Sequence, residues 1–151
     1  VGEDKAAMRA ALDAAVAELP ESAPRYLMGV GPPEDLVEGV ARGIDLFDCV
    51  MPTRHGRTCW LFTSFGRVLI KNAQYARDES PVDPACACVV CCSYSRAYLR
   101  HLFTSGEMLS AQLNSIHNLH FHFQVMERAR DAIRAGKWAE YRDFCLQRIA
   151  K

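Results

Sequence analysis

The sequence predicts an α/β protein, and two observations carry this prediction. Residues 25–50 contain two short apolar stretches on either side of a helical segment, which is the order of a βαβ unit with parallel strands. From residue 93 onward the apolar pattern is helical, with breaks near Gly106 and Gly136. The chain has 151 residues, is 50% hydrophobic and carries 18 basic and 18 acidic side chains, which suits one compact soluble domain.

The first elements are a helix and a strand. Residues 4–19 predict an amphipathic helix because apolar side chains recur at spacings of three and four, and Pro20 ends it. Residues 25–30 predict a short buried strand. The Gly-Pro-Pro sequence at residues 31–33 then breaks the chain, so a new element is expected to begin there.

A second helix and a second strand follow this break. Glu34 and Asp35 suit the positively polarised N-terminus of the helix. Gly43 suits the position just past its C-terminus, where a left-handed backbone conformation is common. Residues 44–50 predict the second strand. Two strands joined through one helix are typical of α/β proteins.

The middle of the chain is predicted to contain two loops and a hairpin. Residues 51–57 are expected to form a flexible loop. Residues 58–63 and 67–70 are expected to pair as a hairpin that turns between them. A loop bracketed by Pro81 and Pro84 then leads into a cluster of cysteines.

Composition excludes several classes of protein. No stretch approaches the roughly 20 apolar residues that a membrane-spanning helix needs, and residues 1–19 lack the basic and apolar regions of a signal peptide. We therefore expect a cytoplasmic protein, and because the chain begins with Val1 rather than Met, we expect a piece of a longer one. The zero net charge argues against a general polyanion-coating protein, although a local basic patch can still bind nucleic acid.

The most specific pattern in the sequence is C-x-C-x2-C, formed by Cys86, Cys88 and Cys91. Three thiolates on one tight loop suit zinc, which usually has four tetrahedral ligands in structural sites. A disulfide scaffold is disfavoured because no targeting segment accompanies the seven cysteines, and three unpaired buried thiols are disfavoured in a cytosolic protein. Spacing alone leaves the fourth ligand open among His101, His117, His120, His122 and Cys92.

Longer motifs resemble a known family. The sequence RYLMGVGPPEDLVEGVARGIDLFDCVMPTRHGR at residues 25–57 resembles the segment of bacterial tRNA-guanine transglycosylases that spans the last two barrel strands. The C-x-C-x2-C pattern, SRAYLRHL at residues 95–102 and IHN at residues 116–118 resemble the zinc region of the same family. The resemblance covers almost the whole chain.

This resemblance implies the C-terminal part of a TIM-type (β/α)8 barrel with an inserted zinc-binding subdomain. A barrel needs about 250 residues, so the chain would supply only the last strands and helices. The implied division is residues 1–57 for these barrel elements with the nucleophile and the RNA-binding loops, 58–122 for the hairpin and zinc-binding subdomain, and 123–151 for C-terminal helices. The resemblance also implies one structural Zn²⁺ ion, held by Cys86, Cys88, Cys91 and His117.

Asp48 is the candidate nucleophile. It lies at the predicted C-terminal end of a strand, where barrel enzymes place catalytic groups, although an isolated aspartate there is more often a turn residue. The resemblance implies that the wobble guanine of tRNA is exchanged for 7-aminomethyl-7-deazaguanine or queuine, in queuosine biosynthesis. Retention at the anomeric carbon calls for a covalent ribosyl-aspartate intermediate. The family's general acid/base falls outside this chain, so we expect the fragment alone to be inactive.

The resemblance also implies two segments that contact the anticodon loop of tRNA and a pocket for the 7-deazaguanine base. Arginine suits phosphates and base edges, although a TRHGR sequence alone is more often a solvated surface turn. Val1 is larger than the glycine of the eukaryotic family, which favours the smaller bacterial base. The implied RNA-binding residues are Gly29, Val30, Gly31, Pro32, Pro33, Glu34, Asp35, Thr53, Arg54, His55, Gly56 and Arg57. The implied substrate-binding residues are Val1, Gly2, Glu3 and Met28.

The main alternative is a catalytically inactive, zinc-stabilised module that binds tRNA or a partner. The aspartate within FDCVMPTR favours the enzyme, because its presence discriminates the enzyme from modules that resemble the non-catalytic subunit of the eukaryotic heterodimer. An archaeal relative that acts elsewhere on tRNA is disfavoured by the PTR sequence. The family further implies a homodimer that forms near the zinc subdomain and has no contact with a membrane.

Overall fold

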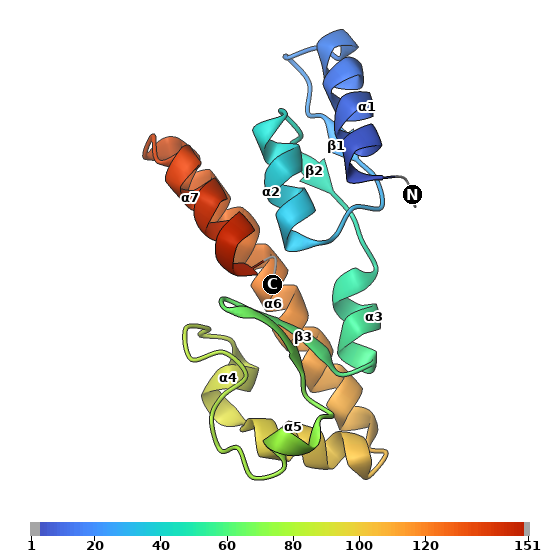
Figure 1. Cartoon of the computed structure of the whole chain (residues 1–151), viewed down its shortest axis with the longest axis vertical. Helices are drawn as coiled ribbons and strands as arrows, with labels where there is room; N and C mark the ends of the chain where they lie inside the picture. Colours follow the sequence, from blue (N-terminus) through green and yellow to red (C-terminus); the bar gives the residue numbers. More distant parts are fainter. Residues whose placement is uncertain (1–3, 150–151) are drawn as a thin grey trace.

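The computed structural model describes residues 4–149 as a mixed α/β structure organised along one long helix, α6 (Figure 1). A small α/β unit lies beside one end of α6, and a hairpin with the cysteine loop lies beside the other. The first unit consists of α1 (Lys5–Glu18), β1 (Tyr26–Leu27), α2 (Pro33–Ala41) and β2 (Leu46–Phe47).

The predicted βαβ unit is confirmed, with β1 and β2 parallel and Tyr26 opposite Leu46. The two strands are much shorter than predicted, because each has only two residues. A ladder requires both partners to stay extended, and the chain leaves β1 at Gly29, which has a φ of +73°. Gly43, with a φ of +87°, has the predicted left-handed conformation just past α2.

Residues 51–57 were expected to form a loop, and this expectation is wrong. They form helix α3 (Met51–Arg57), which packs along α6. A β-carbon added at Gly56 would lie 2.7 Å from the backbone nitrogen of Ser115 in α6, so the two helices approach closely because this residue is glycine. Proline and glycine usually indicate turns, but here Pro52 stands in the first turn of the helix and packing on α6 stabilises it.

The predicted hairpin is confirmed as β3 (Trp60–Thr63) and β4 (Gly66–Leu69), which pair antiparallel with Trp60 opposite Leu69. A short 3-10 turn, η1 (Ala73–Tyr75), follows it. The cysteine loop then runs into the one-turn helix α4 (Val89–Ser93).

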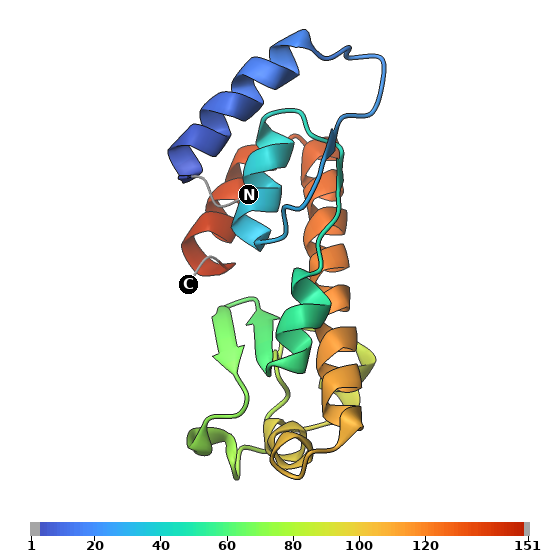
Figure 2. The same cartoon turned by 90° about the vertical axis from the view of Figure 1, so that its right-hand side faces the viewer.

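The helical second half is also confirmed. Its breaks fall at Gly106 and Gly136, with φ of +74° and +68°. Helix α6 has 27 residues and is about 40 Å long at 1.5 Å per residue, so it runs past both parts of the molecule (Figure 2). The remaining elements are α5 (Arg96–Thr104), α6 (Met108–Arg134), α7 (Trp138–Phe144) and the π-helical turn η2 (Cys145–Ile149).

Two apolar clusters hold these elements together. One surrounds the hairpin and the cysteine loop and includes Leu61, Ile70 and Leu99, all of them fully buried. The other joins α2, β3, α6 and η2 through residues that include Val37 and Phe62. The second cluster fixes the α/β unit against α6. The same helix also contributes a residue to the cysteine cluster described below.

Among the residues that the structure describes, the strands form two separate two-stranded sheets. The barrel therefore remains an expectation about a longer protein. No helix in the described part of the chain has both the length and the apolar character that membrane crossing requires.

Candidate metal centre and the Asp48 cleft

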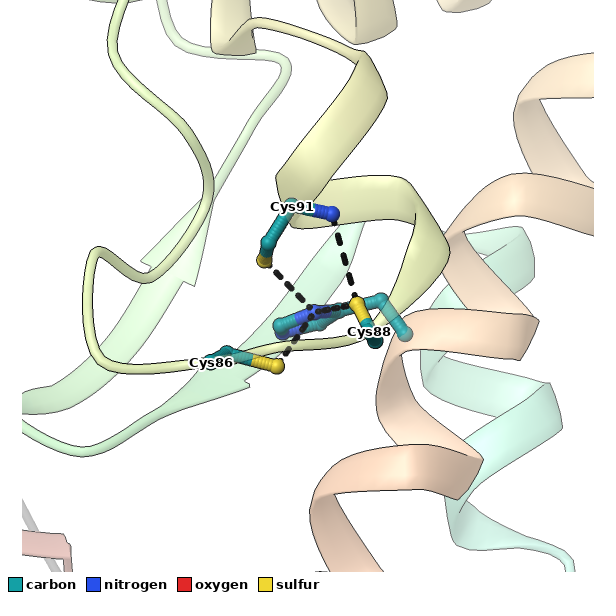
Figure 3. Close-up of side chains that lie close together, drawn as sticks. Cys86, Cys88 and Cys91 are labelled. Atoms are coloured by element: carbon teal, nitrogen blue, oxygen red, sulfur yellow. Dashed lines mark hydrogen bonds between the residues drawn. The ribbon is translucent and has the colours of Figure 1, made fainter.

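Four side chains from two distant segments converge on one buried point. The Sγ atoms of Cys86, Cys88 and Cys91 and a ring nitrogen of His117 all lie within 4.8 Å of one another, and all four residues are buried (Figure 3). The Nδ1 atom of His117 lies 4.0, 3.5 and 3.3 Å from the three sulfurs in chain order. The cysteines come from the loop before α4 and from α4 itself, and the histidine comes from α6.

Local structure explains why the three thiols face one another. Cys88 caps the N-terminus of α4, and its sulfur accepts the backbone N–H of Cys91 at 3.3 Å. The buried carboxylate of Asp83 accepts the backbone N–H groups of Ser64 at 2.7 Å and Ala85 at 2.8 Å, which ties the cysteine loop to the tip of the hairpin. The loop is therefore fixed at both ends of the C-x-C-x2-C pattern.

The ring of His117 is also oriented for metal binding. Its Nε2–H donates to the backbone carbonyl of Phe62 at 2.8 Å, so the Nδ1 lone pair faces the sulfurs. This is the arrangement in which a second hydrogen bond fixes the tautomer of a metal-bound histidine. A tetrahedral zinc ion with bonds of about 2.3 Å to sulfur and about 2.0 Å to nitrogen would put the ligand atoms about 3.6 Å apart. The observed separations fit such an ion.

The ionisable groups of the cluster are strongly coupled to one another. Burial alone would lower the pKa of His117, but hydrogen bonds to Cys86 and Cys88 raise it to about 9. The hydrogen bond from Cys86 holds the pKa of the Cys88 thiol far below its ordinary value, while hydrogen bonds with Cys86 and Cys88 raise the pKa of the Cys91 thiol, so the thiols share protons. Thiolate character at a buried site is stabilised by a metal ion, which takes the place of the shared protons.

The structure decides the fourth ligand that spacing left open. His117 is the only histidine in the cluster that the described residues form, while Cys92 and His101 are exposed. His122 binds two backbone carbonyls elsewhere. These positions agree with the ligand set implied by the family resemblance.

Asp48 follows β2 directly, at the predicted end of the strand. Its Oδ1 atom accepts the phenolic O–H of Tyr26 at 2.7 Å and the backbone N–H of Gly29 at 3.0 Å. The Tyr26 bond, followed by the Gly29 bond, holds the pKa of this exposed carboxyl below its ordinary value. Asp48 is therefore an ionised, oriented carboxylate at the surface, as a nucleophile requires.

A cleft of about 250 Å³ lies beside this carboxylate. Asp48, Gly31, Cys49, His122 and Phe123 are among the residues that line it. The structure thus brings residues of the 29–35 segment next to Asp48. The segment at 53–57 does not line this cleft.

The residues of α3 divide into exposed and packed ones. Arg54 and Arg57 are exposed and available to a ligand. The His55 ring packs on Trp60 with centroids 4.4 Å apart, and burial with the nearby Arg67 charge lowers its pKa. Gly56 is buried against α6, and the Thr53 hydroxyl donates to the Val50 carbonyl within α3's first turn. These last three residues therefore have structural contacts of their own.

The 29–35 segment is similarly divided. Glu34 and Asp35 are each only 9% exposed, and their carboxylates pair with Arg67 at 3.1 Å and with Lys5 at 3.0 Å. These pairs, in the first turn of α2, leave Glu34 and Asp35 less free to contact RNA. Gly31 and Pro33 are also buried, Val30 and Pro32 are half-buried, and Gly29 is exposed.

The predicted base pocket is described only in part. Met28 is 71% exposed and follows β1 directly. Val1, Gly2 and Glu3 lie outside the described residues. Sequence reasoning missed Tyr26, because a tyrosine in a short apolar strand gave no indication that its hydroxyl would bind Asp48.

The fold and the site define an α/β protein with an oriented surface carboxylate and a buried Cys3His cluster that can hold a metal ion. The family model described as "Queuine tRNA-ribosyltransferase" matches residues 1–151. The chain belongs to this family.

Curated relatives agree with the family match. The queuine tRNA-ribosyltransferase of Acidithiobacillus ferrooxidans is 56% identical over 148 residues, which cover 98% of this chain and 40% of the relative. The proteins of the same name from Neisseria gonorrhoeae and Neisseria meningitidis serogroup C are each 57% identical over 141 residues, covering 93% of this chain and 38% of the relative. The chain thus spans about 40% of the length of the relatives it matches.

Proposed function

We propose that this chain is the C-terminal part of a tRNA-guanine transglycosylase, a pentosyltransferase of queuosine biosynthesis. The enzyme exchanges the wobble guanine of tRNA for 7-aminomethyl-7-deazaguanine or queuine. The observation that carries this proposal is the Asp48 carboxylate, held by Tyr26 and Gly29 at the end of a parallel strand. The name of the relatives supports it, since they are queuine tRNA-ribosyltransferases.

In the proposed reaction Asp48 attacks C1′ of the nucleotide, and guanine leaves with a proton from an acid. The incoming base then attacks C1′ of the covalent ribosyl-aspartate, gives up a proton to the conjugate base of that acid and displaces the Asp48 carboxylate, so two inversions give retention. Two hydrogen bonds to one carboxylate oxygen restrict rotation of the Asp48 side chain, and a fixed nucleophile lowers the entropic part of the barrier.

The other proposed parts of the enzyme follow from the same assignment. The βαβ unit is proposed to continue into a (β/α)8 barrel whose remaining strands, base pocket and general acid/base belong to the rest of the protein. The fragment alone is therefore expected to be inactive. We propose that Cys86, Cys88, Cys91 and His117 hold a structural zinc ion, that the anticodon loop contacts exposed Arg54 and Arg57, and that the enzyme is a cytoplasmic homodimer.

The test is Asp48→Asn in the full-length enzyme. Asparagine keeps the shape and the oxygen that accepts the Tyr26 bond but lacks the charge that attacks C1′, so base exchange should fall by several orders of magnitude. Binding of tRNA should persist, and the covalent RNA adduct seen on denaturing gels should vanish. The matched control is Asp45→Asn just before β2, where the carboxylate belongs to the same cleft but accepts the Arg25 backbone N–H. A trapped adduct or retained turnover in Asp48→Asn would move the nucleophile elsewhere.

A further inference from the structure

His122 joins α6 to the segment beside Asp48. Its Nε2 atom lies 2.9 Å from the carbonyl oxygen of Gly31, a residue 91 positions away in the sequence. Its Nδ1 atom lies 2.8 Å from the carbonyl oxygen of Asn118, one helical turn earlier. The ring stands edge-on to Phe62, with centroids 4.8 Å apart. Because both carbonyl oxygens only accept, the neutral ring donates to one of them, and it also packs against Phe62.

The position of the Gly31 carbonyl bears on the hydrogen bonding of Asp48. Two residues before it, the Gly29 N–H donates to Asp48. Gly31 also packs so tightly against Cys49 that an added β-carbon would lie 2.0 Å from the cysteine sulfur. The segment thus touches both Asp48 and the residue that follows it, and a shift of Gly31 would move the Gly29 donor relative to the carboxylate.

The helical turn that carries His122 is itself firmly anchored. The Asn118 side chain accepts the Phe62 N–H at 3.1 Å and donates to the carbonyls of Pro52 and Trp60 at 3.0 and 2.9 Å. Its neighbour His117 belongs to the Cys3His cluster and donates to the Phe62 carbonyl. The Cys3His cluster, α3 and the hairpin are therefore fixed to the part of α6 that carries His122.

We propose that His122 is a positioning residue for the exchange reaction. By donating from Nε2 to the Gly31 carbonyl, it transfers the fixed position of α6 to the 29–31 segment and keeps the Gly29 N–H on Asp48. This role rests on the proposed function of Asp48. His122 also lines the cleft beside Asp48, so its effect acts at short range.

Two amide substitutions separate the two contacts of the ring. Glutamine reaches as far as Nε2, so His122→Gln keeps a donor for the Gly31 carbonyl. Asparagine reaches only as far as Nδ1, so His122→Asn places its amide beside the Asn118 carbonyl and loses the tie to Gly31. Both variants retain a polar side chain at a partly buried site, which makes them matched in charge and similar in burial.

The experiment measures base-exchange kinetics and backbone amide hydrogen exchange at Gly29 in the full-length protein. In His122→Asn we expect kcat to fall about tenfold, KM for tRNA to change by less than about twofold, and the Gly29 amide to exchange about tenfold faster. In His122→Gln, kcat and amide exchange should stay within about threefold of the unmodified protein. Metal content is measured alongside to show that the cluster is intact.

The proposal is overturned if the two variants behave alike, whether both resemble the unmodified protein or both lose activity and metal. It is also overturned if His122→Asn raises KM for tRNA and leaves kcat unchanged. If the unmodified protein shows no base exchange, the proposed function fails, and the Gly29 amide still decides whether His122 holds the segment. The two failures are therefore distinguishable.

Discussion

A single carboxylate oxygen of Asp48 accepts two hydrogen bonds, and their donors come from the neighbouring strand and from the turn after it. The Tyr26 hydroxyl and the Gly29 amide both favour the charged form of the carboxyl and lower its pKa. In return, the bond to the Asp48 carboxylate raises the pKa of the Tyr26 hydroxyl. Asp48 is thus charged and oriented by one side-chain hydroxyl and one backbone amide that the parallel strand pair brings together.

Tyr26→Phe is expected to shift the acid limb of the exchange reaction to higher pH. Loss of the hydroxyl removes the largest cause of the lowered Asp48 pKa, so the carboxyl takes up its proton at a higher pH than before. The measurement is kcat/KM as a function of pH, with Tyr98→Phe as a control at an exposed tyrosine. An acid limb at the same pH in both variants would show that Tyr26 does not govern the charge of Asp48.

Exposed Arg54 and Arg57 on α3 are expected to contact RNA phosphates. Replacement of either by alanine in the full-length enzyme should weaken tRNA binding and reduce the slope of log K against log salt by about one. Binding is measured between low and moderate salt, with Arg134→Ala as a control for an exposed arginine that pairs with Asp131 in α6. An unchanged salt slope would leave α3 with a packing role only.

At the scale of elements, α6 contacts the Cys3His cluster, the hairpin, α3 and the segment beside Asp48. His117 supplies the nitrogen of the Cys3His cluster. Asn118 binds backbone groups of β3 and of α3. His122 contacts the segment beside Asp48. These residues lie within two turns of one helix. We therefore expect that a metal ion bound by the cluster would also restrict the motion of the hairpin and of the segment beside the cleft.

Metal removal is expected to loosen the hairpin and the cysteine loop. Cys88→Ser in the full-length protein should abolish binding of the single zinc ion, while Cys92→Ser at the exposed neighbour should leave metal content unchanged. Metal analysis of the purified proteins and hydrogen exchange of the β3 and β4 amides provide the measurements. The affinity of the protein for the metal ion should fall as pH decreases, because the cysteine thiols must be deprotonated to bind metal. Full metal content in Cys88→Ser would contradict the ligand assignment.

At the scale of the whole molecule, a buried carboxylate joins the two ends of the chain. Glu38 on α2 is 4% exposed and pairs with Arg42 at 2.7 Å, with Arg142 of α7 at 2.8 Å and with Arg9 of α1 at 3.6 Å. A buried carboxylate with several partners costs little when all are present, but loss of its charge removes a partner from three partly exposed guanidinium groups, of which Arg42 keeps a second pair with Asp13. Three helices thus depend on one side chain.

Glu38→Gln is expected to lower the free energy of unfolding at neutral pH by roughly 2 kcal/mol, because its partners are partly exposed to solvent. Burial opposes the charged form of Glu38, but hydrogen bonds from Arg42 and Arg142 hold its pKa below the ordinary value. A lowered pKa stabilises the fold above the unfolded-state pKa, and this stabilisation is lost as pH falls through the folded-state pKa. Denaturant titrations of the full-length protein should therefore show less loss of stability on acidification in Glu38→Gln.

The exposed Glu127 of α6 offers the control for this prediction, since Glu127→Gln should change stability at neutral pH by less than about 0.5 kcal/mol. Equal effects of the two substitutions would mean that the contacts of Glu38 contribute little.

Local sequence was sufficient for the features that depend on spacing or on a single residue's backbone preference. The parallel βαβ order, the hairpin and the breaks at Gly43, Gly106 and Gly136 were all predicted correctly. Apolar periodicity and glycine's freedom at positive φ act within a few residues, so the sequence records them directly. The C-x-C-x2-C pattern likewise indicated a metal cluster from one short segment.

Only the tertiary structure decided the features that depend on a distant partner. Helix α3 looked like a loop because its stability comes from the close approach of Gly56 to α6. Spacing left the fourth ligand open, and the arrival of His117 opposite the cysteines selected it, in agreement with the family resemblance. Glu34 and Asp35 proved buried and paired, and Tyr26 and His122 acquired partners 22 and 91 positions away. Such contacts are set by how whole elements pack, which no short window of sequence contains.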